Sequence, residues 1–270
     1  MSAYSSSSSP SRMPVVFVSH GAPDALLKAP STVASWQKIG QSMPKPKAIL
    51  VLSAHWEAAV PTISLAAQPE TIYDFGGFSR ELYSLRYPAP GATDLAQRIA
   101  QRFAETGMAL QTNATRGLDH GAWVPLLAMF PQADIPVTQL ALPHQGDAAD
   151  FLAIGTVLRP LRNEGVLIVA SGAITHNFGW LRWGEGESTQ ALPRAKVFAD
   201  WVGERAEKND IQALSDYRQA PWGKEAHPSD EHFMPLFAAL GAANGDAPTR
   251  YQPLFTYSGL AMDSYVWNAS

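Results

Sequence analysis

Short apolar runs alternate with longer amphipathic segments along most of the chain. Five of the runs have the length and the β-branched content typical of buried strands: 14–20, 47–55, 62–66, 135–144 and 165–172. Three segments between or after them repeat apolar residues at helical spacing: 92–107, 147–165 and 192–210. This order predicts an α/β fold in which helices flank a central, largely buried mixed sheet.

The same pattern predicts one domain. A chain of 270 residues with 46% hydrophobic residues can bury a sizeable core, and no long linker or internal repeat divides it. We expect this domain to span 13–270 and to carry the Pro- and Gly-rich stretch 73–91 as a long, ordered surface loop. The Ser-rich segment 1–12 is expected to be a disordered tail, and Met13 is an alternative start of the chain.

Charge and hydropathy narrow the range of partners. Twenty basic and twenty-four acidic side chains give a net charge of −4, which does not favour binding to nucleic acid or to an anionic membrane. No apolar run reaches transmembrane length, and the first residues lack the apolar core of a secretory signal. We therefore expect a cytoplasmic protein whose partner is a small molecule.

The chain contains no cysteine. This excludes disulfides, thiolate nucleophiles, iron–sulfur clusters and zinc sites built on sulfur. Any metal ion must therefore be held by histidine, aspartate or glutamate.

Four of the seven histidines fall at or near the carboxyl ends of predicted strands: His20, His55, His144 and His176. In open α/β sheets this edge is where ligands bind, and because adjacent strands are only about 5 Å apart, side chains that leave their ends can converge on one ion. Taken singly, His20 or His55 could equally be a hydrogen-bonded residue at a strand end. Together they favour a divalent metal ion at the carboxyl ends of the strands.

Other polar groups near these strands are weaker candidates. His144 is flanked by polar loop residues, and we assign it to the surface or the rim of a site. Asp24 and Glu57 could be carboxylate ligands, although such residues are more often solvated loop charges.

Two further histidines, His227 and His232, precede an apolar segment that ends near Gly241. Ser229 or Asp230 could cap a helix there and hold His232 in or near its first turn. The two histidines are not at the i, i+4 spacing of a helical metal-binding pair, so both binding one ion is not expected. One is expected to bind metal, and the other to orient substrate or a ligand.

His120 and His176 are candidates for proton transfer. His120 follows Asp119, which could cap the next apolar segment and leave His120 exposed, or His120 could act as a general acid or base. His176 follows the strand 165–172 and could be a fourth ligand or a base beside the metal.

Aromatic residues are frequent around these histidines, and their default role is packing, although an aromatic substrate would use the same surface. They are Trp56, Tyr73, Phe75, Phe78, Tyr83 and Tyr87.

Six motifs occur in order along the chain: SHGAP, LSAHWE, YDFGGFSRELYSLRYPAPG, GLDHGAWVPL, SGAITHNF and HPSDEHFMPL. On these motifs, which span nearly everything from Met13 to Leu240, the chain resembles the class III extradiol ring-cleavage dioxygenases, and more closely their DOPA 4,5-dioxygenase-like branch. It differs at Ala22 of SHGAP, where the family often has serine.

The resemblance implies a catalytic domain that opens the ring of a catechol-type substrate with dioxygen at one non-haem divalent metal ion, with iron(II) expected for activity. It also implies residue roles: His20, His55 and His232 as metal ligands, His176 as a fourth ligand or a second catalytic base, His120 as the acid/base, and His227 and Tyr73 beside the substrate.

An alternative arises from the ligand types. Iron(II) oxygenases usually use two histidines and a carboxylate, whereas here the matching third position is His232. Three neutral imidazoles could equally hold zinc, so the alternative is a zinc-dependent hydrolase in which the ion activates water. A non-catalytic metal-binding module is the least favoured interpretation, and the sequence determines neither the exact catechol nor the oligomeric state.

Overall fold

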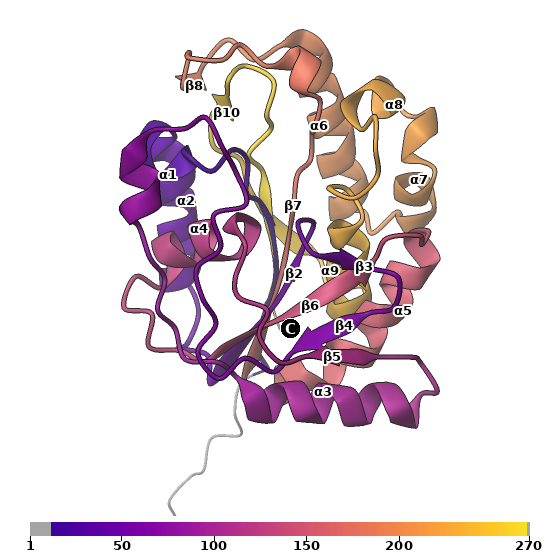
Figure 1. Cartoon of the computed structure of the whole chain (residues 1–270). Coiled ribbons are helices and arrows are strands. Elements are labelled where there is room, and N and C mark those ends of the chain that lie inside the picture. Colours follow the sequence, from indigo (N-terminus) through magenta and orange to yellow (C-terminus); the bar gives the residue numbers. More distant parts are fainter. Residues whose placement is uncertain (1–11, 269–270) are drawn as a thin grey trace, which may run out of the picture.

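Four parallel strands form the centre of the sheet. In the computed structural model, which describes residues 12–268, they lie side by side in the order β6 (Val137–Pro143), β2 (Ala48–Ser53), β7 (Val166–Gly172) and β1 (Val15–Ser19). Antiparallel strands extend one edge: β11 (Ser264–Trp267) pairs with β1, and β9 (Pro248–Tyr251) follows it. The sheet is therefore mixed, as predicted (Figure 1).

The other edge is built from short strands. β4 (Thr62–Ser64) runs antiparallel to β6, β5 (Gln111–Asn113) pairs with β4, and β3 (Glu57–Ala58) pairs with the end of β6. A separate two-stranded sheet joins β8 (Glu187–Ser188) to β10 (Phe255–Thr256).

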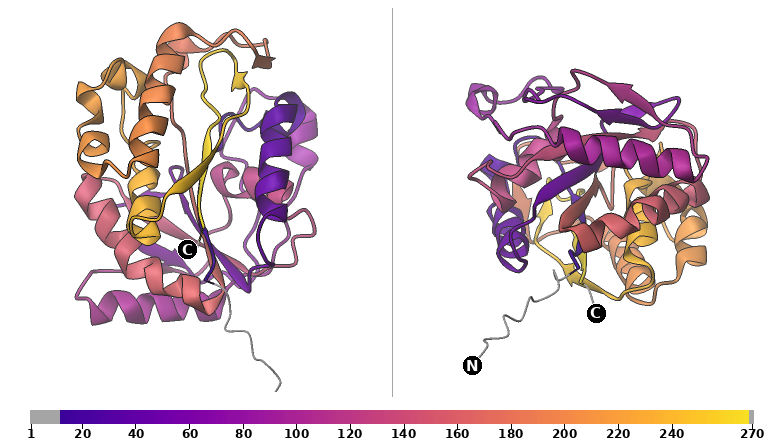
Figure 2. Two further views of the ribbon diagram at one scale, coloured as in Figure 1. Left: turned by 180° about the vertical axis from the view of Figure 1, so that it is seen from behind. Right: turned by 90° about the horizontal axis from the view of Figure 1, so that it is seen from below.

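Helices cover both faces of the sheet (Figures 1 and 2). One face packs against α3 (Thr93–Glu105), α5 (Ala148–Leu158), α6 (Pro193–Glu207) and α9 (Pro235–Ala243). The opposite face packs against α2 (Pro30–Gln41) and α4 (His120–Met129). Because side chains of a strand alternate between faces, Phe17 belongs to the first core and Val16 and Val18 to the second. The central strands are consequently apolar at almost every position.

The remaining elements are short. They are the α-helices α1 (Ala25–Lys28), α7 (Ile211–Ser215) and α8 (Gly223–Ala226), and the 3₁₀ helices η1 (Arg80–Ser84), η2 (Arg159–Glu164), η3 (Phe178–Trp180) and η4 (Tyr217–Gln219). Within residues 12–268, no helix combines the length and the apolarity needed to cross a membrane.

The predicted elements agree with the structure except at some ends. All five predicted strands and the helices at 92–107 and 192–210 are present, while the segment 147–165 divides into α5 and η2. The stretch 73–91 is a surface loop that contains the single short helix η1. The expected tail 1–12 lies outside the described residues apart from Arg12.

A fully buried arginine ties together the segments at the base of the sheet. The guanidinium of Arg162, in η2, donates hydrogen bonds to the carbonyls of Met13 and Trp267, at 2.7 and 3.2 Å. It also donates to the carbonyls of Ala242 and Ala243 at the end of α9, and forms an ion pair with Asp246. The buried guanidinium of Arg162 thus connects the start of β1, the end of α9 and the end of β11.

We predict that Arg162→Met lowers the free energy of unfolding by about 3–5 kcal/mol, because it leaves buried carbonyls and a carboxylate without their partner. Urea denaturation measures this change. The control is Arg98→Met, since Arg98 is half exposed and pairs with Glu164 at the surface, where loss of an ion pair changes stability by less than about 1 kcal/mol. Equal effects of the two substitutions would contradict the prediction.

Candidate metal centre and its cavity

Two histidines leave the ends of strands that flank the central strand β7. His20 directly follows β1, and His55 follows β2 by two residues. Between them, at the end of β7, the hydroxyl of Ser171 donates to the carbonyl of Gly121 at 2.5 Å and accepts from Nδ1 of His20 at 2.9 Å. Because the proton of His20 is therefore on Nδ1, its Nε2 presents a lone pair.

The third histidine reaches the same place from the turn before α9. The carbonyl of His232 accepts a hydrogen bond from the amide of Ala173 at 2.8 Å. This approach requires Gly172, because a Cβ atom at that position would lie 2.2 Å from the same carbonyl oxygen. Nδ1 of His232 donates to the carboxylate of Glu231 at 2.9 Å, which again leaves the lone pair on Nε2.

The expected helix cap in this turn is wrong. The helix α9 begins at Pro235 after Met234, so neither Ser229 nor Asp230 caps it and His232 precedes its first turn. The carboxylate of Asp230 instead accepts hydrogen bonds from Tyr217 and Arg218. Proline at the first helical position needs no partner for an amide proton, which explains the later start.

Three Nε2 atoms converge at this edge of the sheet. Nε2 of His55 lies 2.9 Å from Nε2 of His20 and 3.2 Å from Nε2 of His232. Nδ1 of His55 faces the carboxylate of Asp74 at 3.7 Å, which is longer than a hydrogen bond. Three imidazole nitrogens this close together form a ligand set that suits a cation. The spacing matches imidazole nitrogens that bind one ion at about 2.0–2.1 Å.

Burial keeps these imidazoles neutral. Desolvation, reinforced by the neighbouring histidines, lowers the pKa of His20 and of His232 well below 6.5. Burial and then His120 lower the pKa of His55 to about 3. Neutral imidazole is the form that binds metal, and the site therefore fits a divalent cation without prior loss of protons near neutral pH.

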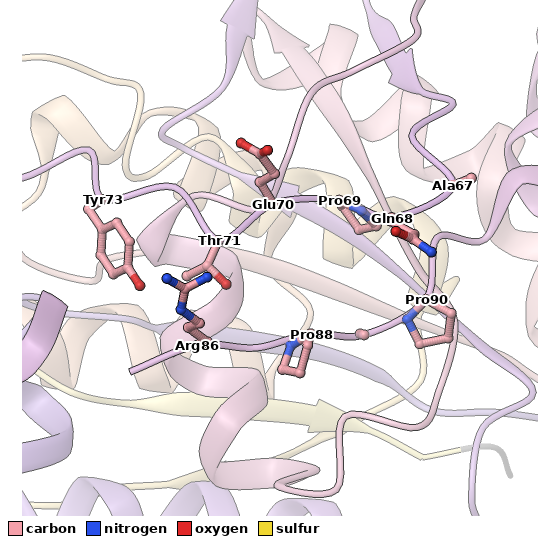
Figure 3. Close-up of a pocket in the computed structure, with 10 residues that line it drawn as sticks. Ala67, Gln68, Pro69, Glu70, Thr71, Tyr73, Arg86, Pro88 and Pro90 are labelled. Carbon is pink, nitrogen blue, oxygen red and sulfur yellow. The ribbon is translucent and has the colours of Figure 1, made fainter. Parts of the chain in front are cut away.

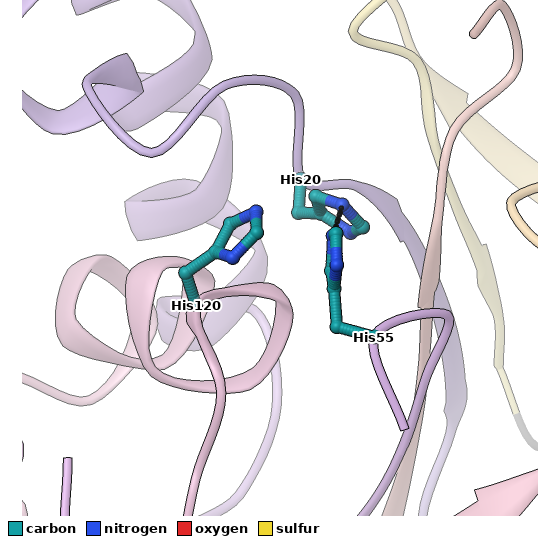
Figure 4. Close-up of side chains that lie close together, drawn as sticks. All are labelled: His20, His55 and His120. Atoms are coloured by element: carbon teal, nitrogen blue, oxygen red, sulfur yellow. Dashed lines mark hydrogen bonds between the residues drawn. The ribbon is translucent and has the colours of Figure 1, made fainter. Parts of the chain in front are cut away.

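His120 is the first residue of α4 and lies next to His55 (Figure 4). Asp119 caps this helix, as predicted, by accepting from the amide of Ala122. His120 is only 5% exposed, so the alternative of an exposed capping-loop residue is wrong. Its ring centroid is 3.9 Å from that of His55, yet within the described residues its nitrogens make no contact of hydrogen-bonding length with His20 or His55.

An aspartate that the sequence analysis did not identify holds His120. The carboxylate of Asp74 accepts from both the backbone amide and Nδ1 of His120, at 3.0 and 2.9 Å. Partial burial raises the pKa of Asp74, but the hydrogen bonds from His120 outweigh it and lower the pKa to about 2. Asp74 is therefore ionised, and a ring nitrogen of His120 lies within 4.8 Å of ring nitrogens of His20 and His55.

The sequence gives only weak indications of the two carboxylates, Asp74 and Glu231, that contact these histidines. Asp74 and Glu231 both lie inside quoted motifs, YDFGGF and HPSDEH. Asp74 acts on His120, which only the fold brings close. Glu231 acts on its sequence neighbour His232, but nothing in the motif distinguishes it from a solvated charge.

His176 stacks on His232. The two rings are 3.5 Å apart and nearly parallel, at 11°. Lone pairs of an imidazole lie in the ring plane, and two parallel rings stacked this closely direct their lone pairs along separate planes. Nδ1 of His176 lies 3.7 Å from Glu231. Although ligand atoms of His176, Glu231 and His232 lie within 4.8 Å of one another, this stacking favours a base beside the centre over a fourth ligand.

His227 is fully buried behind the site. Its Nε2 donates to the carbonyl of Ile174 at 2.9 Å, and its ring packs on Phe233 at 4.9 Å. Within the described part of the chain it is not among the residues that line the cavity. The structure therefore does not support its expected contact with substrate, and places it as a support of the segment before His176.

Tyr73 is also directed away from the histidines. Its hydroxyl donates to the carbonyl of Leu85 at 2.7 Å, and its ring packs against Phe75 and Trp123. It lines a separate hollow of about 740 Å³, together with Glu70 and Arg86 (Figure 3). The expected contact of Tyr73 with substrate is thus not supported, and Phe75 occupies that place.

The weaker candidates for the site, Asp24, Glu57 and His144, lie away from the histidine cluster. Asp24 is buried, accepts a hydrogen bond from Tyr257 and pairs with Lys28. Glu57 and His144 are exposed at the surface, as expected for the latter. None of the three approaches the converging Nε2 atoms in the described contacts.

A cavity of about 300 Å³ opens directly onto the histidine cluster. One wall carries His55, His120, His176 and His232 with Asp74. The other wall is apolar and is formed by Ala22, Pro23, Phe75, Phe78, Phe178, Leu181, Trp183 and Leu260, with Gly21 and Gly76 completing the lining. This volume accommodates a small ligand, and its aromatic wall suits a flat ring.

Comparison with known proteins agrees with this arrangement. The family model for the catalytic LigB subunit of aromatic ring-opening dioxygenase matches residues 13–267. A protein of Escherichia coli K12 named 4,5-DOPA dioxygenase extradiol is 38% identical over 243 residues, which are 89% of each chain. The protein of the same name from Beta vulgaris is 42% identical over 84% of this chain and 85% of its own length.

Two further similarities extend the comparison. A protein of Hapsidospora irregularis named dioxygenase tasH is 36% identical over 95% of this chain and 86% of its own length. The crystal structure of an uncharacterised protein from Escherichia coli K12 superposes with a TM-score of 0.77 at 32% identity, covering 94% of this chain and 99% of that one.

We predict that the protein binds one divalent ion per chain and that His20→Ala, His55→Ala and His232→Ala each reduce the bound metal to near zero, because each removes one of the three converging Nε2 atoms. Metal analysis after anaerobic loading with iron(II) and desalting measures this. His144→Ala, which removes an exposed histidine, is the matched control and should retain the wild-type content. Full metal content in any of the first three variants would remove that residue from the ligand set.

Proposed function

The chain belongs to the family of the catalytic LigB subunit of aromatic ring-opening dioxygenases, and from this premise we propose that it cleaves the ring of a catechol-type substrate beside its hydroxyl groups, using dioxygen. The observation that carries the proposal is the convergence of three neutral imidazole nitrogens at the inner end of a cavity with an aromatic wall. A buried histidine held by an ionised aspartate faces the same cavity.

His20, His55 and His232 would hold the metal ion. Iron(II) is the ion expected for activity, because zinc has no redox chemistry, although three imidazoles could hold zinc as well. When bound, iron(II) supplies the redox chemistry through which a catechol and dioxygen react. Ser171 and Glu231 fix the orientation of His20 and His232, so two of the three nitrogens are directed before any ion is present.

The apolar wall would hold the substrate ring against the histidines. Phe75 packs edge-on against the ring of His120, with centroids 5.7 Å apart, and Phe78 packs against Phe75 in the same manner. A flat ring in this slot has its hydroxyl groups directed toward the converging nitrogens. The enclosing side chains also exclude water from that face of the substrate.

His120 would move the proton. With Nδ1 donating to the ionised Asp74, Nε2 is free to accept a proton from a catechol hydroxyl group, and the nearby carboxylate stabilises the imidazolium that forms. The same Nε2 can return the proton as the ring opens. His176 lines the cavity above His232 and is the second group able to exchange a proton with the substrate.

The function is tested by loading the protein with iron(II) without air, adding 4-methylcatechol, and then admitting oxygen. A yellow ring-fission product should form, with one dioxygen consumed per catechol in an oxygen electrode. A zinc-loaded protein that hydrolyses esters or amides while the iron-loaded protein leaves catechols unchanged would support the hydrolase instead.

We predict that His120→Ala retains wild-type metal content but slows ring cleavage by roughly 10²–10⁴-fold, the usual contribution of a positioned acid/base. Iron analysis and kcat on the same preparation separate the two quantities. Loss of metal in this variant would make His120 a ligand, and unchanged kcat would leave it a structural residue of the helix start.

For Asp74, a positioning residue, we predict that Asp74→Asn lowers kcat by roughly 10–100-fold and shifts the acidic limb of the kcat–pH profile to lower pH. An amide holds the ring of His120 less firmly and does not stabilise the imidazolium that forms when the ring accepts a proton from the substrate, as an ionised carboxylate does. Asp134→Asn, at an exposed pair with Lys45, is the control. A lowered kcat with an unmoved profile would indicate a merely structural effect.

A further inference from the structure

The cavity beside the histidines contains very little charge. Asp74 is the single acidic side chain in its lining, and that carboxylate already accepts two hydrogen bonds from His120. Among the described residues that line the cavity there is no lysine and no arginine. Away from the metal centre, a carboxylate on a ring substituent would therefore find no lysine or arginine among the described lining residues.

Cations near the mouth have partners of their own. Nζ of Lys28 lies 3.2 Å from the carboxylate of Asp24, and 5.9 Å from the centre of the Tyr257 ring. Arg182 neighbours the lining residue Leu181 but is exposed and lies 3.8 Å from Glu185. Neither cation lines the cavity.

Two large aromatic side chains at the mouth are left in water. Phe178 is 64% exposed and Trp183 is 56% exposed, yet both line the cavity. Their ring centroids are 6.2 Å apart, and Phe178 lies 4.9 Å from His176. The apolar surface is thus continuous from the histidines to the outside, as is typical of a surface that a ligand covers.

We propose that the natural substrate is a catechol whose ring substituent is uncharged and apolar, and that Phe178 and Trp183 bind this substituent. The proposal rests on the proposed function and names its substrate class. DOPA, after which several relatives are named, carries a carboxylate and an ammonium group on its side chain. Moving an unpaired carboxylate from water to this mouth is unfavourable, whereas an apolar group gains by covering exposed aromatic rings.

The experiment compares two substrates that differ mainly in charge. They are 3-(3,4-dihydroxyphenyl)propanoate and its methyl ester, with unsubstituted catechol as the reference and DOPA as a further arm. For the iron(II)-loaded protein, kcat/KM for the ester should exceed kcat/KM for the acid and for DOPA by roughly tenfold or more. The difference should lie mainly in KM, because the substituent is remote from the bond that breaks.

Substitutions of Phe178 and Trp183 test whether these two residues cause the preference for the ester over the acid. Trp183→Ala and Phe178→Ala should each raise KM for the ester several-fold more than they raise KM for unsubstituted catechol. Trp183→Arg, which places a cation at the same position, should reverse the preference in favour of the acid. Trp222→Ala, at another tryptophan that is 45% exposed but does not line the cavity, is the matched control.

The outcomes separate this proposal from the function on which it rests. If the acid or DOPA is cleaved as efficiently as the ester, or if the mouth variants leave the ester-to-acid ratio unchanged, the substrate class is wrong while ring cleavage stands. If none of the catechols is cleaved, the proposed function fails and this proposal fails with it.

Discussion

The convergence of three imidazoles is the constraint around which the site is built. The Nε2 atoms of His20 and His232 lie 2.9 and 3.2 Å from Nε2 of His55. Two of the rings are held through their other nitrogen, His20 by Ser171 and His232 by Glu231, while Nδ1 of His55 faces Asp74. The fold thus directs two of the three nitrogens toward the third before any ion is present.

This arrangement requires the strand order. His20 and His55 leave β1 and β2, which are separated by β7, and β7 contributes only the small residues Ser171 and Gly172 at its end. A larger side chain at Gly172 would collide with the carbonyl of His232 and displace this histidine from the cluster. His144 leaves β6 on the other side of β2, and its exposure shows that a strand-end position alone does not place a histidine in the site.

The sequence predicted what depends on local pattern. Buried strands, the two strand-end histidines and the capping role of Asp119 follow from hydrophobic runs and short motifs, and all three are present in the fold. The role of Asp74 could not be predicted, because this carboxylate accepts a hydrogen bond from His120, a residue 46 positions away in the sequence. The start of α9 was misplaced because Pro235 can begin a helix without a capping side chain, and no pattern in HPSDEH reveals this.

The apolar wall of the cavity adjoins a turn with a strained backbone that surrounding hydrogen bonds hold in place. Tyr257 and Ser258 both adopt left-handed conformations, with φ of 51° and 58°, at a cost of roughly 1–3 kcal/mol each. The surrounding contacts determine this turn: the hydroxyl of Tyr257 donates to Asp24, and its amide donates to the carbonyl of Gly186. Its carbonyl accepts from Arg182, between the lining residues Leu181 and Trp183. The apolar wall is thereby anchored to the segment after β1, which also carries His20, so one set of contacts positions both the cavity wall and this histidine.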